Sequence, residues 1–251
     1  MRKLWGLPGA AALFASCWWI PRAAVVPMRT IAHPGAGVAG GDLVVFLPGR
    51  GDRAEDFEER GFLAAAREAG LDADVLAVDA HLAYYYKRVI MDRLWEDVVL
   101  PARARGYRRV FVVGISLGGL GALSLAQEHP DAVAGMFVLA PYLGEPALTR
   151  EIEAAGGLAR WGGGPSERDF RGVWSFLRGY AVGEARPPLW LAYGDSDRYA
   201  YGHRLLASVL PGERVLVTPG GHDWKAWERL WREFLARGAF PGTVRAGSAP
   251  R

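Results

Sequence analysis

The feature that most constrains the fold is an alternation of short apolar runs with longer amphipathic stretches from Gly41 onward. Apolar runs without polar alternation, such as residues 110–113 (VFVV), are typical of strands that are covered on both faces of a sheet. Helical periodicity between such strands is the pattern of βαβ units. We therefore predict an α/β fold, with a mostly parallel central sheet flanked by helices.

The expected elements can be placed from these runs. Strands are predicted at residues 43–47, 73–78, 109–114, 135–140, 189–193 and 214–217, and helices at residues 54–69, 86–105, 117–128, 201–209 and 223–236. No internal repeat of about 20 to 50 residues is visible, which excludes a solenoid or propeller. We interpret residues 41–237 as one domain. Residues 238–251 lack periodicity and are interpreted as a flexible tail.

One segment of this domain breaks the alternation. Residues 144–186 are rich in glycine and carry scattered aromatic side chains, which predicts a cap insertion of small helices over one end of the sheet. Trp161 and Trp174 are candidates for lining a substrate pocket, or for holding the insertion in place. In the tyrosine run 84–86, Tyr84 is a candidate for bordering the pocket, against packing at the start of a helix.

Composition excludes several classes of protein. The chain has 251 residues, of which 51% are hydrophobic and 23% charged, so it is neither disordered nor of low complexity and can bury a sizeable core. Its 30 basic and 27 acidic residues form no dense basic run, and we expect no nucleic-acid partner. A single cysteine, Cys17, excludes an internal disulfide and a thiolate metal cluster.

The N-terminus has the layout of a targeting segment. Arg2 and Lys3 precede an uncharged stretch from Leu4 to Pro21, so residues 1–22 are interpreted as a signal peptide or membrane anchor. An uncleaved anchor, an ordinary export signal and a merely apolar extension all remain open. All but the last predict an exported or membrane-attached protein, with a cytoplasmic location less favoured.

A fourth interpretation concerns Cys17. The apolar run before it resembles a bacterial lipoprotein signal, with residues 14–17 (FASC) as the lipobox and Cys17 as the lipidated residue. Phe14 departs from this pattern because such signals usually carry Leu there. The bulky residues Trp18 and Trp19 are also unusual after a lipobox.

The most informative motif is residues 114–118 (GISLG), which lie where a predicted buried strand meets a predicted helix. This is the context of a nucleophile elbow, in which a strained turn presents a serine hydroxyl at the carboxyl end of the sheet. Large side chains have no room beside such a turn, which explains Gly114 and Gly118. Ser116 is therefore the candidate nucleophile.

A serine hydroxyl needs a base, and the base needs a group that fixes its tautomer. His222 is the candidate base because it follows the last predicted strand in a loop with two glycines, residues 220–224 (GGHDW). His33 and His129 are interpreted as exposed or capping residues, and His81 and His203 are weaker candidates. The expected chain order is serine, acid, histidine, and the preceding strand ends in Asp195 and Asp197, which both remain open as the acid.

From about Asp42 to Leu235 the chain resembles the α/β-hydrolase superfamily, through the elbow, the acid loop, the histidine loop and the turn after the first strong strand. The acid loop of that superfamily commonly reads G-x-x-D, which implies Asp197 as the acid and Asp195 as a turn residue. Its first turn often begins His-Gly, whereas residues 48–52 here read PGRGD. The resemblance implies an oxyanion hole formed by the backbone amides of Arg50 and Leu117. Because proline replaces the histidine, Gly51 remains an alternative donor.

The resemblance implies a serine hydrolase similar to small bacterial carboxylesterases, which cleaves a small-molecule ester through an acyl-enzyme and needs no cofactor. Acyl transfer or thioester cleavage by the same triad, and less favourably a non-catalytic binding protein, remain alternatives. No phosphate loop, dinucleotide motif or HExxH zinc motif is present in the sequence, so no metal site is expected.

Overall fold

The computed structural model describes residues 22–35, 41–163, 169–183, 187–240 and 242–243. Its strands are β1 (Thr30–His33), β2 (Asp42–Leu47), β3 (Asp74–Val78), β4 (Arg109–Ile115), β5 (Gly135–Leu139), β6 (Leu189–Gly194) and β7 (Val215–Thr218). They form one seven-stranded sheet in the order β1-β3-β2-β4-β5-β6-β7. All neighbours are parallel except β1, which runs antiparallel to β3 with Thr30 opposite Val78. The predicted mostly parallel sheet is confirmed.

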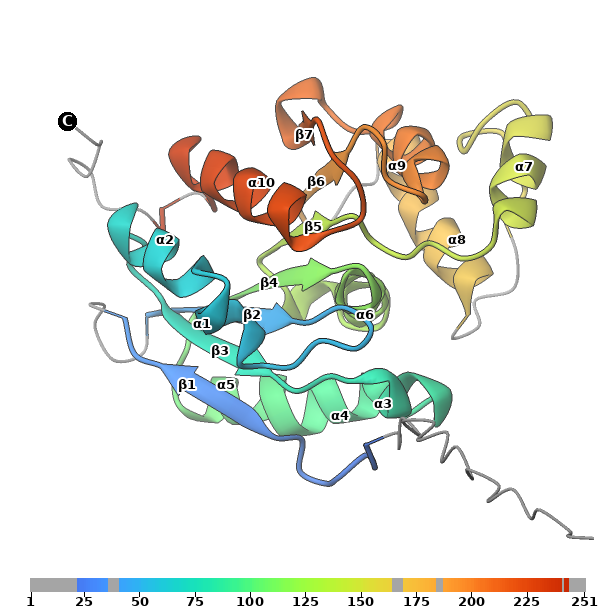
Figure 1. Cartoon of the computed structure of the whole chain (residues 1–251). Coiled ribbons are helices and arrows are strands. Elements are labelled where there is room, and N and C mark those ends of the chain that lie inside the picture. The colour runs from blue at the N-terminus through green and yellow to red at the C-terminus, as the bar shows by residue number, and fades with distance from the viewer. Residues whose placement is uncertain (1–21, 36–40, 164–168, 184–186, 241, 244–251) are drawn as a thin grey trace, which may run out of the picture.

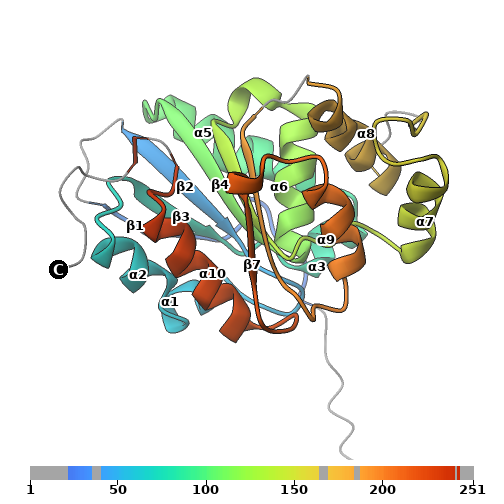
Figure 2. The ribbon, with the colours of Figure 1, turned by 90° about the horizontal axis from the view of Figure 1, so that it is seen from above.

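Helices cover both faces of this sheet (Figure 1, Figure 2). They are α1 (Asp56–Glu59), α2 (Phe62–Glu68), α3 (Leu82–Tyr86), α4 (Ile90–Leu94), α5 (Leu100–Ala104), α6 (Leu117–Glu128), α7 (Pro146–Ala154), α8 (Phe170–Ala181), α9 (Ala200–Ala207) and α10 (Trp224–Ala236). The helices α1, α2 and α10 lie on one face, and α4, α5, α6 and α9 lie on the other. The complete burial of β2 and β5 follows from this double cover.

The largest part of the aromatic core lies between the sheet and the α2–α10 layer. Phe62 stacks on Trp231 with ring centroids 5.6 Å apart, and Phe46 meets both rings edge to face. The indole nitrogen of Trp231 donates to the Phe62 carbonyl over 2.9 Å, so this buried polar atom is satisfied. The second and last helices of the domain, α2 and α10, are thereby joined on one face of the sheet.

Two long helices predicted from the sequence are interrupted. Between α1 and α2, Gly61 adopts a left-handed φ of 74° and ends the predicted helix 54–69 early. The predicted helix 86–105 is divided at Arg88, which has a φ of 57°, and contains a wide π-helical turn over Trp95–Val99. Pro101 follows that turn, and because proline has no amide hydrogen it disturbs the regular helical pattern just before it.

Both ends of the domain extend beyond the predicted boundaries. Strand β1 was not expected, because it is a short edge strand whose residues alternate between exposed and half-buried. The prediction of a flexible tail from residue 238 is wrong for Phe240, which is fully buried and stacks on Phe111 with centroids 4.4 Å apart. Thr243 is also buried, and its carbonyl accepts the Asp72 amide over 2.6 Å.

The insertion predicted at residues 144–186 contains α7 and α8. Both pack on other helices, α7 beside α9 and α8 beside α6, and so they widen one helical layer (Figure 2). Within the described residues no helix is long and apolar enough to cross a bilayer. Cys17 and the rest of the predicted targeting segment up to residue 21 lie outside the described residues.

Candidate active site

Ser116 lies at the sharp turn between the end of β4 and the start of α6. Its backbone has φ 50° and ψ −108°, a strained conformation for a residue with a side chain. A Cβ atom at Gly114 would lie 2.3 Å from the Gly118 carbonyl oxygen, and one at Gly118 would lie 2.1 Å from the Leu47 carbonyl oxygen. Only glycine fits at these two positions, and the close packing around them holds the serine in its strained turn.

The structure brings Ser116, His222 and Asp197 together from three separate loops. His222 Nε2 lies 2.8 Å from Ser116 Oγ, and His222 Nδ1 lies 2.7 Å from Asp197 Oδ2. The histidine side chain is 7% exposed and that of the aspartate is fully buried, so water competes little for the Asp197 contact. Tyr199 and Trp227 meet the imidazole ring edge to face at 5.0 and 5.1 Å and fix its plane.

The acid loop and the histidine loop touch through their glycines. A Cβ atom at Gly194 would lie 2.2 Å from the Gly220 carbonyl oxygen, so the two loops can meet only if residue 194 is glycine. Asp195 is exposed on this loop, accepts the Gly220 amide over 3.2 Å and so holds the histidine loop from the outside. Of the two carboxylates that the sequence left open, Asp197 contacts the imidazole and Asp195 forms the turn.

The electrostatics of Asp197 result from opposing effects. Burial alone would raise the pKa of this carboxyl group, but hydrogen bonds from His222 and from the Tyr199 amide, at 2.7 Å, outweigh it. The net pKa lies below its ordinary value, so the carboxylate is charged at neutral pH. Each of its oxygens has one partner, Oδ1 the Tyr199 amide and Oδ2 the imidazole.

A second histidine is buried near this site. His203 is fully buried, and its Nε2 donates to the Pro141 carbonyl over 2.9 Å, next to the strained residue Ala140 (φ 47°). Burial lowers the pKa of His203 to about 4, so the ring is neutral at pH 7. Tyr142, the residue after Pro141, donates its backbone amide to the Ser116 carbonyl over 2.9 Å. This contact holds the backbone beside the serine.

The loop after β2 lies directly against the serine. A Cβ atom at Gly49 would lie 3.6 Å from Ser116 Cβ. Arg50 and Leu117 both line the cleft beside Ser116, and among the described residues nothing accepts a hydrogen bond from either amide. Two amides of this kind can stabilise a negative oxygen.

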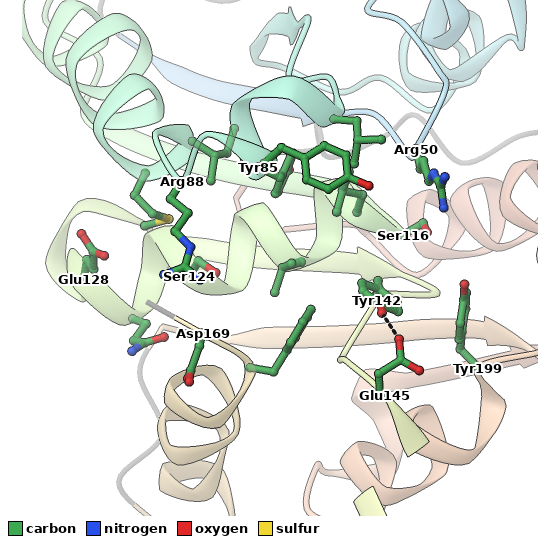
Figure 3. Close-up of a pocket in the computed structure, with 18 of the residues that line it drawn as sticks. Arg50, Tyr85, Arg88, Ser116, Ser124, Glu128, Tyr142, Glu145, Asp169 and Tyr199 are labelled. Carbon is green, nitrogen blue, oxygen red and sulfur yellow. Dashed lines mark hydrogen bonds between the residues drawn. The ribbon is translucent and has the colours of Figure 1, made fainter. Parts of the chain in front are cut away.

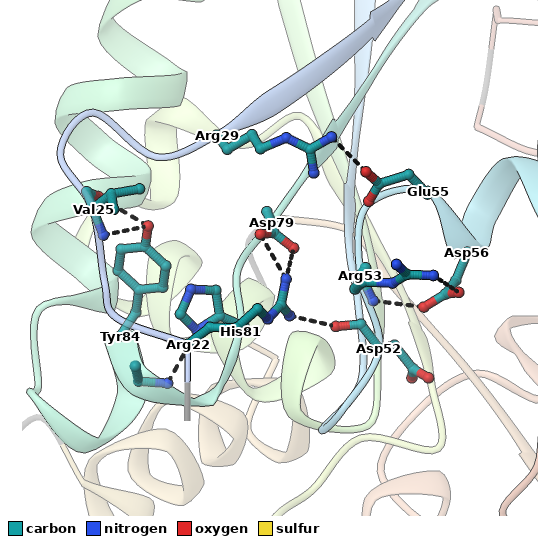
Figure 4. A network of polar contacts seen from close by, with 11 residues as sticks. Arg22, Val25, Arg29, Asp52, Arg53, Glu55, Asp56, Asp79, His81 and Tyr84 are labelled. Atoms are coloured by element: carbon teal, nitrogen blue, oxygen red, sulfur yellow. Dashed lines mark hydrogen bonds and ion pairs between the residues drawn. The ribbon is translucent and has the colours of Figure 1, made fainter. Parts of the chain in front are cut away.

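Other residues hold this loop where the superfamily often has a histidine. The Asp52 amide donates to the Gly49 carbonyl over 3.2 Å, and the indole nitrogen of Trp224 donates to Asp52 Oδ1 over 3.2 Å. Arg22 Nη2 donates to the Asp52 carbonyl over 3.0 Å, while Nη1 donates to both oxygens of Asp79 (Figure 4). The N-terminal residues of the described chain therefore support the loop from outside.

Ser116 opens into a cleft of about 630 Å³ (Figure 3). The floor is one face of α6, one wall comes from α3 and α4, and the opposite wall comes from the segments after β5 and β6 and from the start of α8. Tyr142 and Tyr199 stand near Ser116, and Tyr142 Oη donates to Glu145 Oε1 over 2.6 Å. This volume suits a small organic molecule.

Three predicted pocket residues lie elsewhere. Tyr84 is 1% exposed and faces away from the cleft, with its hydroxyl bonded to the amide and carbonyl of Val25 at 3.1 and 2.9 Å (Figure 4). Trp161 donates to Glu151 over 3.0 Å and Trp174 donates to the Leu143 carbonyl over 3.0 Å, and both are buried. Neither tryptophan lines the cleft, and both hold the insertion in place.

Of the same tyrosine run, Tyr85 and the exposed Tyr86 line the cleft. The Tyr85 hydroxyl is buried and has no hydrogen-bond partner among the described residues, and a Cβ atom at Gly121 would lie 2.5 Å from it. The N-cap of α3 is the side chain of His81, and because histidine is not a preferred N-cap residue the sequence did not indicate where α3 starts or which tyrosine points inward. Tyr142 and Tyr199 were also missed, although each follows the carboxyl end of a parallel strand.

Among the described residues, no cluster of three histidine, cysteine or carboxylate side chains is placed to hold a metal ion. The parallel sheet, the strained serine turn and the histidine loop after the last strand define a serine hydrolase of the α/β-hydrolase superfamily. Within that superfamily the chain belongs to the Esterase family, whose model matches residues 58–237. It is an enzyme that hydrolyses ester bonds.

Solved structures share this fold at low sequence identity. Est1E from Butyrivibrio proteoclasticus is 16% identical with a TM-score of 0.58, over 86% of this chain and 95% of its own. S-formylglutathione hydrolase FrmB from Staphylococcus aureus is 13% identical with a TM-score of 0.57, over 88% and 99%. The bottromycin epimerase BotH is 22% identical with a TM-score of 0.50, over 85% and 94%. Such identities show a common fold, and the epimerase illustrates that one fold serves different reactions.

Proposed function

We propose that Ser116 is the nucleophile of this esterase, His222 its general base and Asp197 the acid that orients the imidazole. The observation that carries this proposal is the unbroken hydrogen-bonded chain from Asp197 through His222 to a serine that opens into the cleft. A serine hydroxyl is a poor nucleophile at neutral pH, and this arrangement supplies both the base and the group that fixes its tautomer.

In the first step Ser116 Oγ attacks the ester carbonyl carbon while His222 Nε2 takes the hydroxyl proton. The imidazolium formed is stabilised by Asp197, and it then gives that proton to the alkoxide oxygen of the departing alcohol. The acyl group stays on Oγ until a water molecule, deprotonated by the same Nε2, attacks its carbonyl carbon. The bond between Oγ and the acyl group then breaks, Nε2 returns the proton to Oγ, and the carboxylic acid leaves. The amides of Arg50 and Leu117 stabilise the negative oxygen of both tetrahedral intermediates, by about 3 kcal/mol for each donor.

We infer that the substrate is a small-molecule carboxylic ester. The cleft of about 630 Å³ lies in the size range of small-ligand sites and joins Ser116 to an apolar wall. A structure of Est1E holds ferulic acid, an aromatic carboxylic acid, and Est1E has the same fold at 15% identity. This likeness supports an organic acid as the acyl half of the substrate.

The test is labelling of the purified full chain with a fluorophosphonate, followed by intact-mass measurement. We expect one adduct on the wild type and on the control variant Ser208→Ala. In the wild type the Ser208 hydroxyl donates to the Leu205 carbonyl and does not contact His222. We expect no adduct on Ser116→Ala or His222→Ala. A folded wild type without adduct would refute the proposed nucleophile. Product analysis with and without an acceptor alcohol separates hydrolysis from acyl transfer.

We also propose that the protein is exported or attached to a membrane through residues 1–22. Support comes from the sequence, where Arg2 and Lys3 precede an uncharged stretch that resembles a lipoprotein signal ending at Cys17. Replacing Cys17 with alanine and fractionating the cells tests the lipid-linked form. Loss of both the lipid mass and the membrane fraction is expected, and no change in either would contradict lipidation.

A further inference from the structure

The cleft extends well beyond the serine because it follows one face of α6. Leu117, Leu120, Ser124 and Glu128 all line it, at the three- and four-residue spacing that places side chains on one side of a helix. Ser116 and Ser124 are eight residues apart, which corresponds to about 12 Å along the helix axis. A ligand that fills the cleft therefore reaches far from the bond that is cleaved (Figure 3).

The middle of the cleft is apolar. Its walls there are formed by Leu82, Ile90, Met91, Leu117, Leu120 and Phe170. An alkyl chain or an aromatic ring is stabilised on such a surface in proportion to the apolar area that it removes from water. This part of the cleft selects for hydrophobic bulk and carries no preference for charge.

Beyond the apolar part, Arg88 extends over α6 toward Ser124 (Figure 3). Arg88, Arg50 and Arg198 all line the cleft, and none of them forms an ion pair or hydrogen bond with another described residue. Arg22, in contrast, is paired with Asp79 at 2.8 Å. The positive charge along this cleft is therefore available to a ligand.

The carboxylates of the same lining are already engaged. Glu145 accepts the Tyr142 hydroxyl over 2.6 Å, and Asp169 accepts the Gly172 amide over 2.8 Å as the N-cap of α8. Glu128 also has an interaction partner. Each of these carboxylates is thus held by a contact of its own, whereas the guanidinium groups keep their N–H donors unused by the described residues, and a guanidinium donates most strongly to an anion.

The backbone of Arg88 is a second, independent observation. Its φ of 57° is the left-handed conformation, which glycine and asparagine adopt most readily and which costs other residues free energy. Strained residues of this kind cluster at functional sites. Glycine would fit the turn after α3 better, but it would leave this part of the cleft without a cation.

We infer that the substrate is an ester with an apolar body and an anionic group at the end remote from the scissile carbonyl, and that Arg88 binds this anion. The inference rests on the proposed role of Ser116. Either half of the ester can carry the anion, and the experiment has one arm for each. In the first arm, para-nitrophenyl monoesters of suberic and sebacic acid are compared with para-nitrophenyl octanoate and decanoate. In the second arm, acetates of hydroxybenzoic acids are compared with phenyl acetate.

We expect the wild type to have a higher kcat/KM for the anionic ester than for its neutral counterpart in one arm. Arg88→Asn removes the cation and keeps a residue that tolerates the left-handed backbone. This variant should lower the ratio of anionic to neutral kcat/KM about tenfold, the lower end for a charged hydrogen bond at an exposed site, and Arg88→Lys should restore part of it. Lys87→Gln, a neighbouring exposed cation outside the lining, should leave the ratio unchanged.

Two results would overturn the inference. One is an absence of preference for the anionic ester in both arms, with neutral esters still cleaved, which would leave the role of Ser116 intact. The other is an equal loss for anionic and neutral esters in Arg88→Asn, which would assign Arg88 a purely structural role. Failure of Ser116→Ala to abolish cleavage would instead refute the proposed function itself.

Discussion

Replacing Asp197 with asparagine should reverse the tautomer of His222. The Tyr199 amide donates to Oδ1 of Asp197 at 2.7 Å and requires an acceptor there, so an asparagine must place its oxygen at that position. Its NH₂ group then faces His222 Nδ1, where the carboxylate oxygen now lies at 2.7 Å. The imidazole can accept this hydrogen bond only by moving its own proton to Nε2, and Nε2 can then no longer take the proton of Ser116.

The expected loss is large because the base is removed while the geometry stays. A reversed tautomer lowers kcat by about 10⁴ in serine triads, which corresponds to about 5 kcal/mol of transition-state stabilisation. The assay is the steady-state hydrolysis of para-nitrophenyl acetate, together with the rate of fluorophosphonate labelling. Circular dichroism of both proteins checks that the variant is folded.

Asp195→Asn is the matched control. Asp195 is two residues away and exposed, and it holds the Gly220 amide rather than the imidazole. An asparagine oxygen can still accept that amide, so kcat should change less than tenfold, as expected for one weakened hydrogen bond. The reasoning would be refuted if Asp195→Asn lost activity and Asp197→Asn kept it, because Asp195 would then be the acid.

Two further predictions concern stability. His203 has a pKa of about 4 in the fold against an ordinary value of 6.5, so between these values only the unfolded chain binds the proton and the free energy of unfolding falls as pH falls. We expect the free energy of unfolding, measured in urea, to fall by about 2 kcal/mol more in the wild type than in His203→Gln between pH 6.5 and pH 5. An equal fall in both proteins would contradict this prediction. Phe240→Ala should lower the free energy of unfolding by about 3 to 5 kcal/mol because it empties a buried site, whereas a change below 1 kcal/mol would mean that Phe240 is not part of the core.

The sheet could be predicted because its strands carry an unambiguous signal. Apolar runs such as that of β4 are long, uninterrupted and buried on both faces. Strand β1 could not be predicted in the same way, because half of its residues are exposed and it depends on pairing with β3. The interruption at Arg88 was equally hidden, since arginine gives no local sign of a left-handed backbone.

The residues of the candidate site also differ in how well the sequence predicts them. Ser116, Asp197 and His222 follow the ends of strongly predicted strands, and the glycines around them mark close approaches of the backbone that can be read from sequence. The walls of the cleft depend instead on the rotation of short helices. Tyr84 and Tyr85 differ by one position, and only the start of α3 decides that the first faces Val25 and the second faces the cleft.

The close approach of Tyr85 to Gly121 sets how wide a substrate the cleft can accept. The Tyr85 hydroxyl can approach α6 this closely only because residue 121 has no side chain, since a Cβ atom there would lie 2.5 Å from the hydroxyl oxygen. A single methyl group at this position would lift the ring into the space above the helix and narrow the passage between the serine and the rest of the cleft. Substrate bulk is thus set about one and a half helical turns away from Ser116, and evolution or design can change it without altering any residue that takes part in the chemistry.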